Sequence, residues 1–258
     1  LRALIGSLIG DSLSNVQAGS AKAAEIKAAL IAEGLWSQYL EVGIGPDAEV
    51  FTKSQPMAAV GYGAQVGINR ISEWNNPEPE VVLAVDSQGN IRGATLGNDV
   101  NLRDVEGRSA LLLGKAKDNN ASCSIGPFIR LFDEHFTLAD IENATLTLSV
   151  SGLDGFEMSG GSNMAEISRK PANLVKQTRN DSHQYPDGFM LFLGTMFAPT
   201  QDREKKGSGF THKAGDLVEI STPLLGTLRN TVVYSDEAAP WTYGTRALMR
   251  NLAKRGLL

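Results

Sequence analysis

Apolar residues recur every three or four positions near the start of the chain, most clearly in the stretch AKAAEIKAALIAEGLW. A spacing close to 3.6 residues is typical of an α-helix that buries one face. We therefore predict helix from Leu1 to about Tyr39. Ser20 is suited to cap the main part of this helix, and Gly34 lies near its end.

The pattern changes after Gly43, where turn residues separate short runs of apolar and β-branched residues. Such runs predict strands, as in VVLAVDSQGNIRGATLG, TLTLSVSG, FMLFLGTMF and DLVEIST. The first of them also predicts a β-hairpin whose turn is Gln88-Gly89-Asn90. Between Gly152 and Pro186 we expect a hairpin and then a short helix around Pro171 to Lys176.

The order of these elements indicates a fold class. The final stretch, TRALMRNLAKRGLL, predicts a terminal helix. Strand runs do not alternate regularly with long helices, which argues against a parallel doubly wound sheet. We therefore predict an α+β fold that is mostly β, with peripheral helices.

Composition narrows the classes of function. Hydrophobic residues make up 42% of the 258 residues, enough for a sizeable core. The formal net charge is -5 and no stretch is strongly basic, so we expect neither a nucleic-acid partner nor a membrane partner. No apolar run reaches the roughly 18 residues that span a bilayer.

Two further features concern the cellular setting. Cys123 is the single cysteine and has no partner for an internal disulfide, so we expect a reducing, cytoplasmic compartment. The chain begins with Leu1 rather than Met, so we expect a further segment to precede it in the full-length protein.

The most informative stretch is NNPEPEVVL, in which Glu78 and Glu80 stand two apart just before an apolar run. Residues two apart in an extended chain point to the same side. Like charges that close repel each other unless a cation neutralises them. Asp99 follows 19 positions after Glu80, a distance that a hairpin covers out and back. Three carboxylates suit Mg²⁺, Mn²⁺ or Ca²⁺, although the spacing alone also fits exposed charges at a strand start.

A series of motifs resembles the fumarylacetoacetate hydrolase superfamily. They occur in the family order over most of residues 43–235, as EPEVVLAV, GNDVNLRD, GKAKDNNASCSIGPF, FLGTMFAP and GDLVEISTPLLGTLRN. The resemblance implies a mixed β-sandwich roll and a metal, Mg²⁺ or else Mn²⁺, on Glu78, Glu80 and Asp99. It also implies a catalytic β-roll domain over residues 43–258. We expect the helical segment over residues 1–42, which precedes this domain, to be the end of a longer N-terminal region.

The same resemblance assigns three more site residues. Lys117 stands ten positions before Pro127, the spacing of the family's active-site lysine, whereas its neighbour Lys115 does not. Thr195 matches a Gly-Thr motif that binds the substrate carboxylate, and Glu49 lies where some members carry an acidic group. We therefore expect Lys117 and Glu49 to be catalytic, and Thr195 and Lys117 to bind substrate. Ordinary surface charges and a plain strand threonine are the alternatives.

Longer stretches are similar to a narrower group, the 2-keto-3-deoxy-pentonate (2-dehydro-3-deoxy-D-arabinonate or xylonate) dehydratases of pentose catabolism. These stretches are EWNNPEPEVVL, GNDVNLRDVEGRSALLLGKAKDNNASCSIGPFIRLFDE and QYPDGFMLFLGTMFAP. The similarity implies that a small 2-oxo sugar acid loses water by β-elimination through a metal-stabilised enolate, giving 2-oxoglutarate semialdehyde. It also implies a homodimer or a higher homo-oligomer. The stereochemistry of the substrate stays open.

Two alternatives remain at this point. A hydrolase of a 2,4-diketo acid, from the same superfamily, would need a histidine that a preceding segment or His183 supplies, because no histidine occurs before His135. A non-catalytic domain that binds a metal or a sugar acid is the other. No G-x-S-x-G nucleophile motif occurs, and the histidines lack metal-binding spacing. We expect His135 at the surface, His183 and His212 on loops, and Cys123 as a small buried residue.

Overall fold

The N-terminal part of the chain forms two short helices rather than one long helix. The computed structural model describes residues 16–258, in which α2 spans Ala21–Ala32 and α3 spans Gln38–Ile44. Ser20 caps α2 as predicted, because its side chain accepts a hydrogen bond from the Ala23 N–H at 3.2 Å. Gly34 follows α2 with φ +66°, a left-handed conformation that ends helices. The prediction of one continuous helix to Tyr39 is therefore wrong, and its first 15 residues lie outside the described part.

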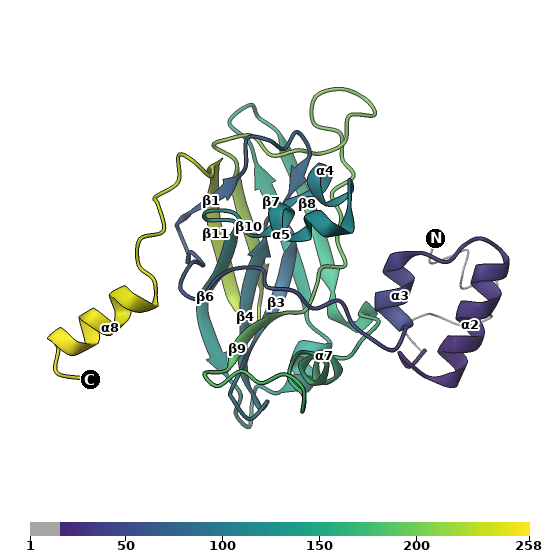
Figure 1. Cartoon of the computed structure of the whole chain (residues 1–258). Helices are drawn as coiled ribbons and strands as arrows, with labels where there is room; N and C mark the ends of the chain where they lie inside the picture. Colours follow the sequence, from purple (N-terminus) through teal and green to yellow (C-terminus); the bar gives the residue numbers. More distant parts are fainter. Residues whose placement is uncertain (1–15) are drawn as a thin grey trace.

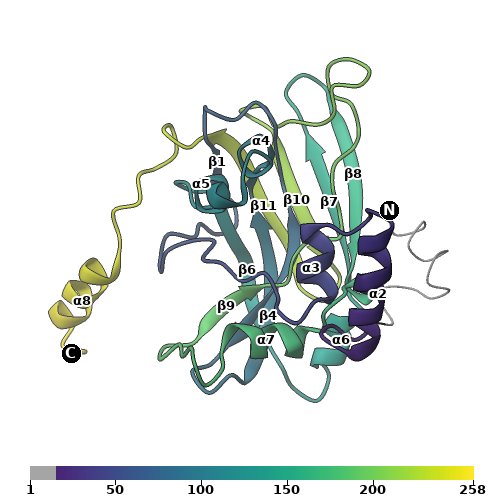
Figure 2. The ribbon, with the colours of Figure 1, turned by 45° about the vertical axis from the view of Figure 1, so that its right-hand side comes forward.

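The two helices share a small core of their own, separate from the main core. Its buried residues are Val16, Ala23, Ile26, Leu30, Leu40 and Ile44. Arg169 ties this part to the rest of the chain, since its guanidinium donates to the carbonyls of Val42, Gly45 and Asp47. Figures 1 and 2 show α2 and α3 beside the sheets. The division at residue 42 stays a prediction.

The largest sheet has five strands in the order β1-β11-β10-β7-β8. β1 and β11 run parallel, and the other neighbours are antiparallel. The strands are β1 (Gln65–Ile68), β7 (Thr145–Ser151), β8 (Glu157–Asn163), β10 (Leu217–Thr222) and β11 (Gly226–Tyr234).

A second sheet of four antiparallel strands, in the order β6-β4-β3-β9, carries the candidate site. The strands are β3 (Pro79–Val85), β4 (Ile91–Asp99), β6 (Cys123–Leu131) and β9 (Phe189–Phe192). The predicted hairpin is confirmed, since β3 pairs with β4 across a turn in which Gly89 has φ +87°. A two-residue ladder of β2 (Asn75–Asn76) and β5 (Asn101–Leu102) flanks the hairpin.

Apolar side chains from both larger sheets form one continuous core. It includes Val81, Leu83 and Leu96 of the four-stranded sheet and Leu146, Leu148 and Ile220 of the five-stranded sheet. The expected mixture of sheets and peripheral helices, without a parallel doubly wound sheet, is therefore confirmed (Figure 1).

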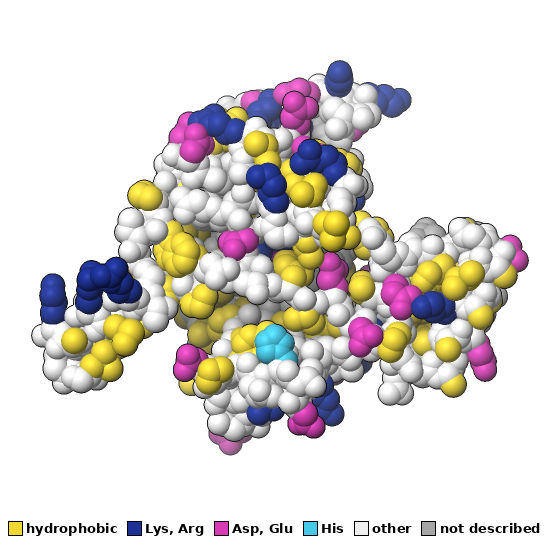
Figure 3. All heavy atoms as spheres, in the orientation of Figure 1, with side chains coloured by type: hydrophobic (Ala, Val, Ile, Leu, Met, Phe, Trp, Pro, Cys, Tyr) yellow, Lys and Arg dark blue, Asp and Glu magenta, His cyan; other side chains and the backbone are white. Residues whose placement is uncertain are grey.

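The remaining helices lie around these sheets. They are α4 (Arg103–Glu106), α5 (Leu113–Lys117), α6 (Leu138–Glu142), α7 (Pro171–Thr178) and α8 (Thr245–Lys254), with 3-10 turns at Ala110–Leu112 and Met164–Glu166. The helices predicted near Pro171 and at the end of the chain are confirmed as α7 and α8. α8 stands apart from the sheets (Figures 1 and 2), and Figure 3 shows basic and apolar side chains on different edges of it. Within the described residues, every helix is too short or too polar to cross a membrane.

Candidate active site

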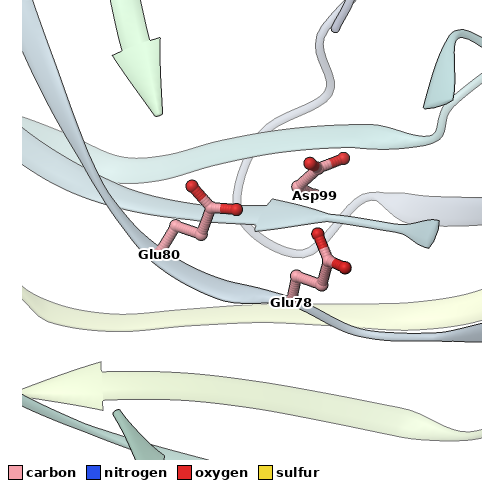
Figure 4. A group of neighbouring side chains, drawn as sticks. All are labelled: Glu78, Glu80 and Asp99. Carbon is pink, nitrogen blue, oxygen red and sulfur yellow. The ribbon is translucent and has the colours of Figure 1, made fainter. Parts of the chain in front are cut away.

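The register of the β3–β4 hairpin brings three acidic residues together. Glu80 lies opposite Gly97, and the Asp99 N–H donates to the Glu78 carbonyl at 3.1 Å, so Asp99 comes to lie beside both glutamates. One carboxylate oxygen from each of Glu78, Glu80 and Asp99 lies within 4.8 Å of the other two. Figure 4 shows the three carboxylates turned toward a common region. The structure thus brings together the three residues predicted as metal ligands.

This acidic cluster is shielded from water and only partly neutralised. Glu80 is 3% exposed and Asp99 is 4% exposed. The Lys117 ammonium lies 2.6 Å from Glu78 Oε2 and 2.9 Å from Asp99 Oδ2, and the Lys53 ammonium lies 2.8 Å from Asp99 Oδ1. Two lysines therefore face three carboxylates. Glu80 Oε2 accepts a hydrogen bond from the Gly194 N–H at 2.6 Å.

The protonation of the cluster follows from this arrangement. Burial raises the pKa of Glu78 to about 7, against the attraction of Lys117. Burial, together with repulsion from Asp99 and Glu78, raises the pKa of Glu80 well above its usual value. Burial acts in the same sense on Asp99, but Lys53 and Lys117 outweigh it and lower the pKa of Asp99.

A divalent cation fits this site on chemical grounds. The three groups offer only oxygen atoms, the donor type that Mg²⁺, Mn²⁺ and Ca²⁺ prefer. Burial and the negative charges of Asp99 and Glu78 disfavour the ionised form of Glu80. A bound cation would stabilise that form by direct electrostatic attraction. Glu78, Glu80 and Asp99 are the residues that could hold it.

Lys117 ends helix α5 and is buried at 4% exposure, whereas Lys115, two residues earlier on the same helix, is exposed. The spacing of the family motif therefore selected the lysine that reaches the acidic cluster. Burial lowers the pKa of Lys117, but Glu78 and Asp99 more than compensate and raise it overall. Lys117 is accordingly a charged donor within this cluster.

Glu49 and Thr195 lie near the cluster in different ways. Glu49 is an exposed residue overall, but its carboxyl group is partly buried. This partial burial and the charge of Glu106 raise its pKa, while the charge of Lys117 lowers it. Glu49 therefore lies within electrostatic reach of the site. Thr195 directly follows Gly194, whose N–H contacts Glu80. Its hydroxyl accepts a hydrogen bond from the Phe197 N–H at 3.2 Å. The functional roles of both residues stay predictions.

Sequence reasoning missed two residues that hold the cluster. Lys53 is 8% exposed, and besides its ion pair with Asp99 it donates to the carbonyl of Lys117 at 2.5 Å. Asn101 donates from Nδ2 to Glu78 Oε1 at 3.0 Å and to Glu106 Oε2 at 2.6 Å. Lysine and asparagine are common at surfaces, so neither residue type signals its burial. The position of Asn101 within GNDVNLRD was the one available hint.

The three histidines and the single cysteine are not among the residues that contact the acidic cluster through the hydrogen bonds and ion pairs described above. His135 is exposed as predicted, and His183 is an exposed loop residue that stacks on Tyr185. His212 is also in a loop, but it is buried, and its Nδ1 lies 3.1 Å from Asp216. Cys123 is a small buried residue as predicted, and burial raises the pKa of its thiol to about 12.

Comparisons with known proteins identify two similar dehydratases. Over 180 residues the chain is 33% identical to a 2-dehydro-3-deoxy-D-arabinonate dehydratase of Saccharolobus solfataricus, covering 70% of this chain and 57% of that protein. It is 31% identical over 195 residues to a probable 2-keto-3-deoxyxylonate dehydratase of Haloferax volcanii, covering 75% of this chain and 63% of that protein. The chain therefore spans less than two thirds of the length of either relative.

A solved structure and a family model agree with these relatives. A 2-keto-3-deoxy-D-arabinonate dehydratase complexed with magnesium and 2,5-dioxopentanoate superposes with a TM-score of 0.66 at 31% identity, covering 77% of this chain and 66% of that one. Residues 18–233 match the family model described as fumarylacetoacetate (FAA) hydrolase C-terminal. This match covers most of the chain, and the chain therefore belongs to the fumarylacetoacetate hydrolase C-terminal family.

Proposed function

We propose that the chain is a metal-dependent hydro-lyase that converts a 2-keto-3-deoxy-pentonate into 2-oxoglutarate semialdehyde. The observation that carries this proposal is the cluster of Glu78, Glu80 and Asp99, of which Glu80 and Asp99 are buried, with Lys117 in contact with Glu78 and Asp99. The names of both relatives support it. So does the ligand named for the similar solved structure, because 2,5-dioxopentanoate is 2-oxoglutarate semialdehyde.

The three carboxylates would hold Mg²⁺, with Mn²⁺ as the alternative. A divalent cation bound there would supply a Lewis acid that stabilises negative charge on the 2-keto oxygen of the substrate. The burial of Glu80 and Asp99 strengthens this effect, because electrostatic interactions are stronger where water is excluded.

The residues of the chain would handle the protons. Glu49 is the candidate for removing a proton from carbon 3, because the raised pKa of its carboxyl makes the carboxylate a better base. The hydroxyl group on carbon 4 then leaves with that proton as water. A proton moves from carbon 5 to carbon 3, and the resulting enol becomes the aldehyde. The charged Lys117 would bind the anionic substrate, because Glu78 and Asp99 raise its pKa and keep it protonated. Thr195 would bind the substrate carboxylate.

The test is an assay of 2-keto-3-deoxy-D-pentonate that follows 2-oxoglutarate semialdehyde, with Mg²⁺ and with a chelator. Glu80→Gln and Lys117→Ala should each abolish metal-dependent turnover. Lys115→Ala is the matched control, since it removes an exposed lysine from the same helix. It should leave turnover unchanged.

Other outcomes would redirect the assignment. Cleavage of a 2,4-diketo acid in place of dehydration would indicate a hydrolase of the same family. Metal binding without turnover on either substrate would indicate a binding domain. Equal activity in Lys115→Ala and Lys117→Ala would contradict the role given to Lys117.

We also propose a cytoplasmic homodimer that acts in pentose catabolism and has the β-sandwich roll of its family. The large exposed apolar side chains of Phe128, Ile129 and Leu131, on the edge strand β6, support self-association. Light scattering coupled to size-exclusion chromatography measures the assembly. A monomer at all accessible concentrations would contradict the dimer.

A further inference from the structure

Asn101 joins the candidate metal ligand Glu78 to a second carboxylate, that of Glu106. Its side chain is 3% exposed, and Nδ2 donates to Glu78 Oε1 at 3.0 Å and to Glu106 Oε2 at 2.6 Å. Both N–H donors of the amide are therefore in use. The other oxygen of Glu78, Oε2, contacts Lys117 at 2.6 Å. Both oxygens of this carboxylate are thus oriented by neighbouring side chains.

The backbone holds the same segment from a second side. Asn101 pairs with Asn76 across the β2–β5 ladder, and Asn76 stands two residues before Glu78. Asn98 adds a further tie, because its Oδ1 accepts from the Glu78 N–H at 3.2 Å. Turning the Glu78 side chain away would break the contact with Asn101 while this backbone stays in place.

Helix α4 anchors the other end of the bridge. Glu106 is its last residue, and Asp104 on the same helix accepts from the Ser72 hydroxyl at 2.6 Å and from the Glu73 N–H at 2.9 Å. These contacts fix α4 to the chain just ahead of β2. Glu106 therefore offers Asn101 a fixed acceptor.

We propose that Asn101, anchored by Glu106, is a positioning residue that sets the orientation of Glu78 for a divalent cation. This inference rests on the proposed metal site. A neutral amide suits the task, because it orients a carboxylate by hydrogen bonding and adds no positive charge that would repel the cation. The lysines of the cluster also form hydrogen bonds to the carboxylates, but their positive charge would repel the cation.

The test measures Mn²⁺ binding to the full chain by the loss of the free-ion electron paramagnetic resonance signal. Glu106→Gln and Glu106→Ala both remove the Glu106 charge, but only glutamine keeps an oxygen that accepts from Asn101. We expect Glu106→Ala to bind Mn²⁺ about tenfold more weakly than Glu106→Gln, and Asn101→Ala to bind it roughly 10- to 100-fold more weakly than the unmodified chain.

Asn230 provides a matched control for the loss of a buried asparagine. It is 2% exposed, and its Nδ2 donates to the carbonyls of Gly61 and Ala64 at 3.0 and 2.9 Å. Asn230→Ala should lower thermal stability and leave the Mn²⁺ affinity unchanged.

The outcomes separate this inference from the metal site itself. Equal Mn²⁺ affinity in the two Glu106 variants, or an Asn101→Ala affinity equal to that of Asn230→Ala, would overturn the role of Asn101. If Asn101→Ala does not fold, the Glu106 pair decides the matter, because Glu106 is only half-buried. An unmodified chain that binds no Mn²⁺ would instead overturn the metal site and, with it, the proposed function.

Discussion

A buried ion pair outside the candidate site should make the stability of this protein depend on pH in the acid range. Arg203 and Asp216 form a two-pronged pair with N–O distances of 2.6 and 2.7 Å, and their side chains are 1% and 0% exposed. His212 Nδ1 lies 3.1 Å from the same carboxylate. Burial raises the pKa of Asp216, but the hydrogen bonds from Arg203 and His212 outweigh it and lower the pKa to about 2.

The sign and size of the effect follow from this pKa. A carboxyl whose pKa is lower in the folded state stabilises the fold above its unfolded pKa and loses that contribution as pH falls through its folded pKa. Taking 3.8 for the unfolded chain, the contribution of Asp216 is about 2 kcal/mol at pH 7. It falls to about half of that near pH 3. Screening by solvent makes this an upper value.

The assay is urea unfolding of the unmodified chain and of Asp216→Asn between pH 3 and pH 7. At pH 7 we expect Asp216→Asn to lower the free energy of unfolding by about 3 kcal/mol, since it leaves the charge of a buried arginine only partly paired. The difference between the two proteins should shrink by about 1 kcal/mol as pH falls to 3. A pH-independent difference, or a loss below about 1 kcal/mol at pH 7, would refute this reasoning.

Three further predictions concern the sheet, the metal site and the N-terminal helices. Gly97→Ala should lower the free energy of unfolding by roughly 1–3 kcal/mol, because a Cβ there would overlap Phe192 and Val82; unchanged urea unfolding would contradict this. Mg²⁺ at 100 times its dissociation constant should raise the melting temperature by about 5–10 °C, and this rise should vanish in Glu80→Gln; an equal rise in both proteins would place the ion elsewhere. Ser20→Ala should destabilise α2 by about 1 kcal/mol through loss of its N-cap, measured as faster amide hydrogen exchange in α2; exchange rates equal to those of the unmodified chain would argue against the cap.

Local sequence determined several elements of the fold, because their formation depends mainly on residues that are close together in the chain. The turn at Gly89 and the run of apolar residues before it suffice for the β3–β4 hairpin. That hairpin in turn fixes the proximity of Asp99 to Glu80, since strand pairing is regular. The proximity of the three carboxylates was therefore predictable from spacing, whereas the resemblance to a known family was needed to assign them a metal and to single out Lys117.

The prediction from sequence was wrong where the apolar spacing was compatible with either one long helix or two short helices. Apolar spacing continues across Gly34, so it predicted one helix up to Tyr39. The backbone at Gly34 instead takes a left-handed conformation, and α3 begins a few residues later to close the small core around Leu30 and Ile44. Packing, rather than periodicity, set this break.

Only the tertiary structure decided how the acidic cluster is held and partly neutralised. Lys53 comes from a segment 46 positions before Asp99, and Gly194 lies 114 positions after Glu80, so no local pattern connects them. Asn101 bridges two carboxylates because the β2–β5 ladder and α4 place them on either side of its amide. The sequence by itself determined which residue types could bind a cation, since strand register acts over short distances. The surrounding charges and burial arise from contacts between distant segments, and these exist only once the chain has folded.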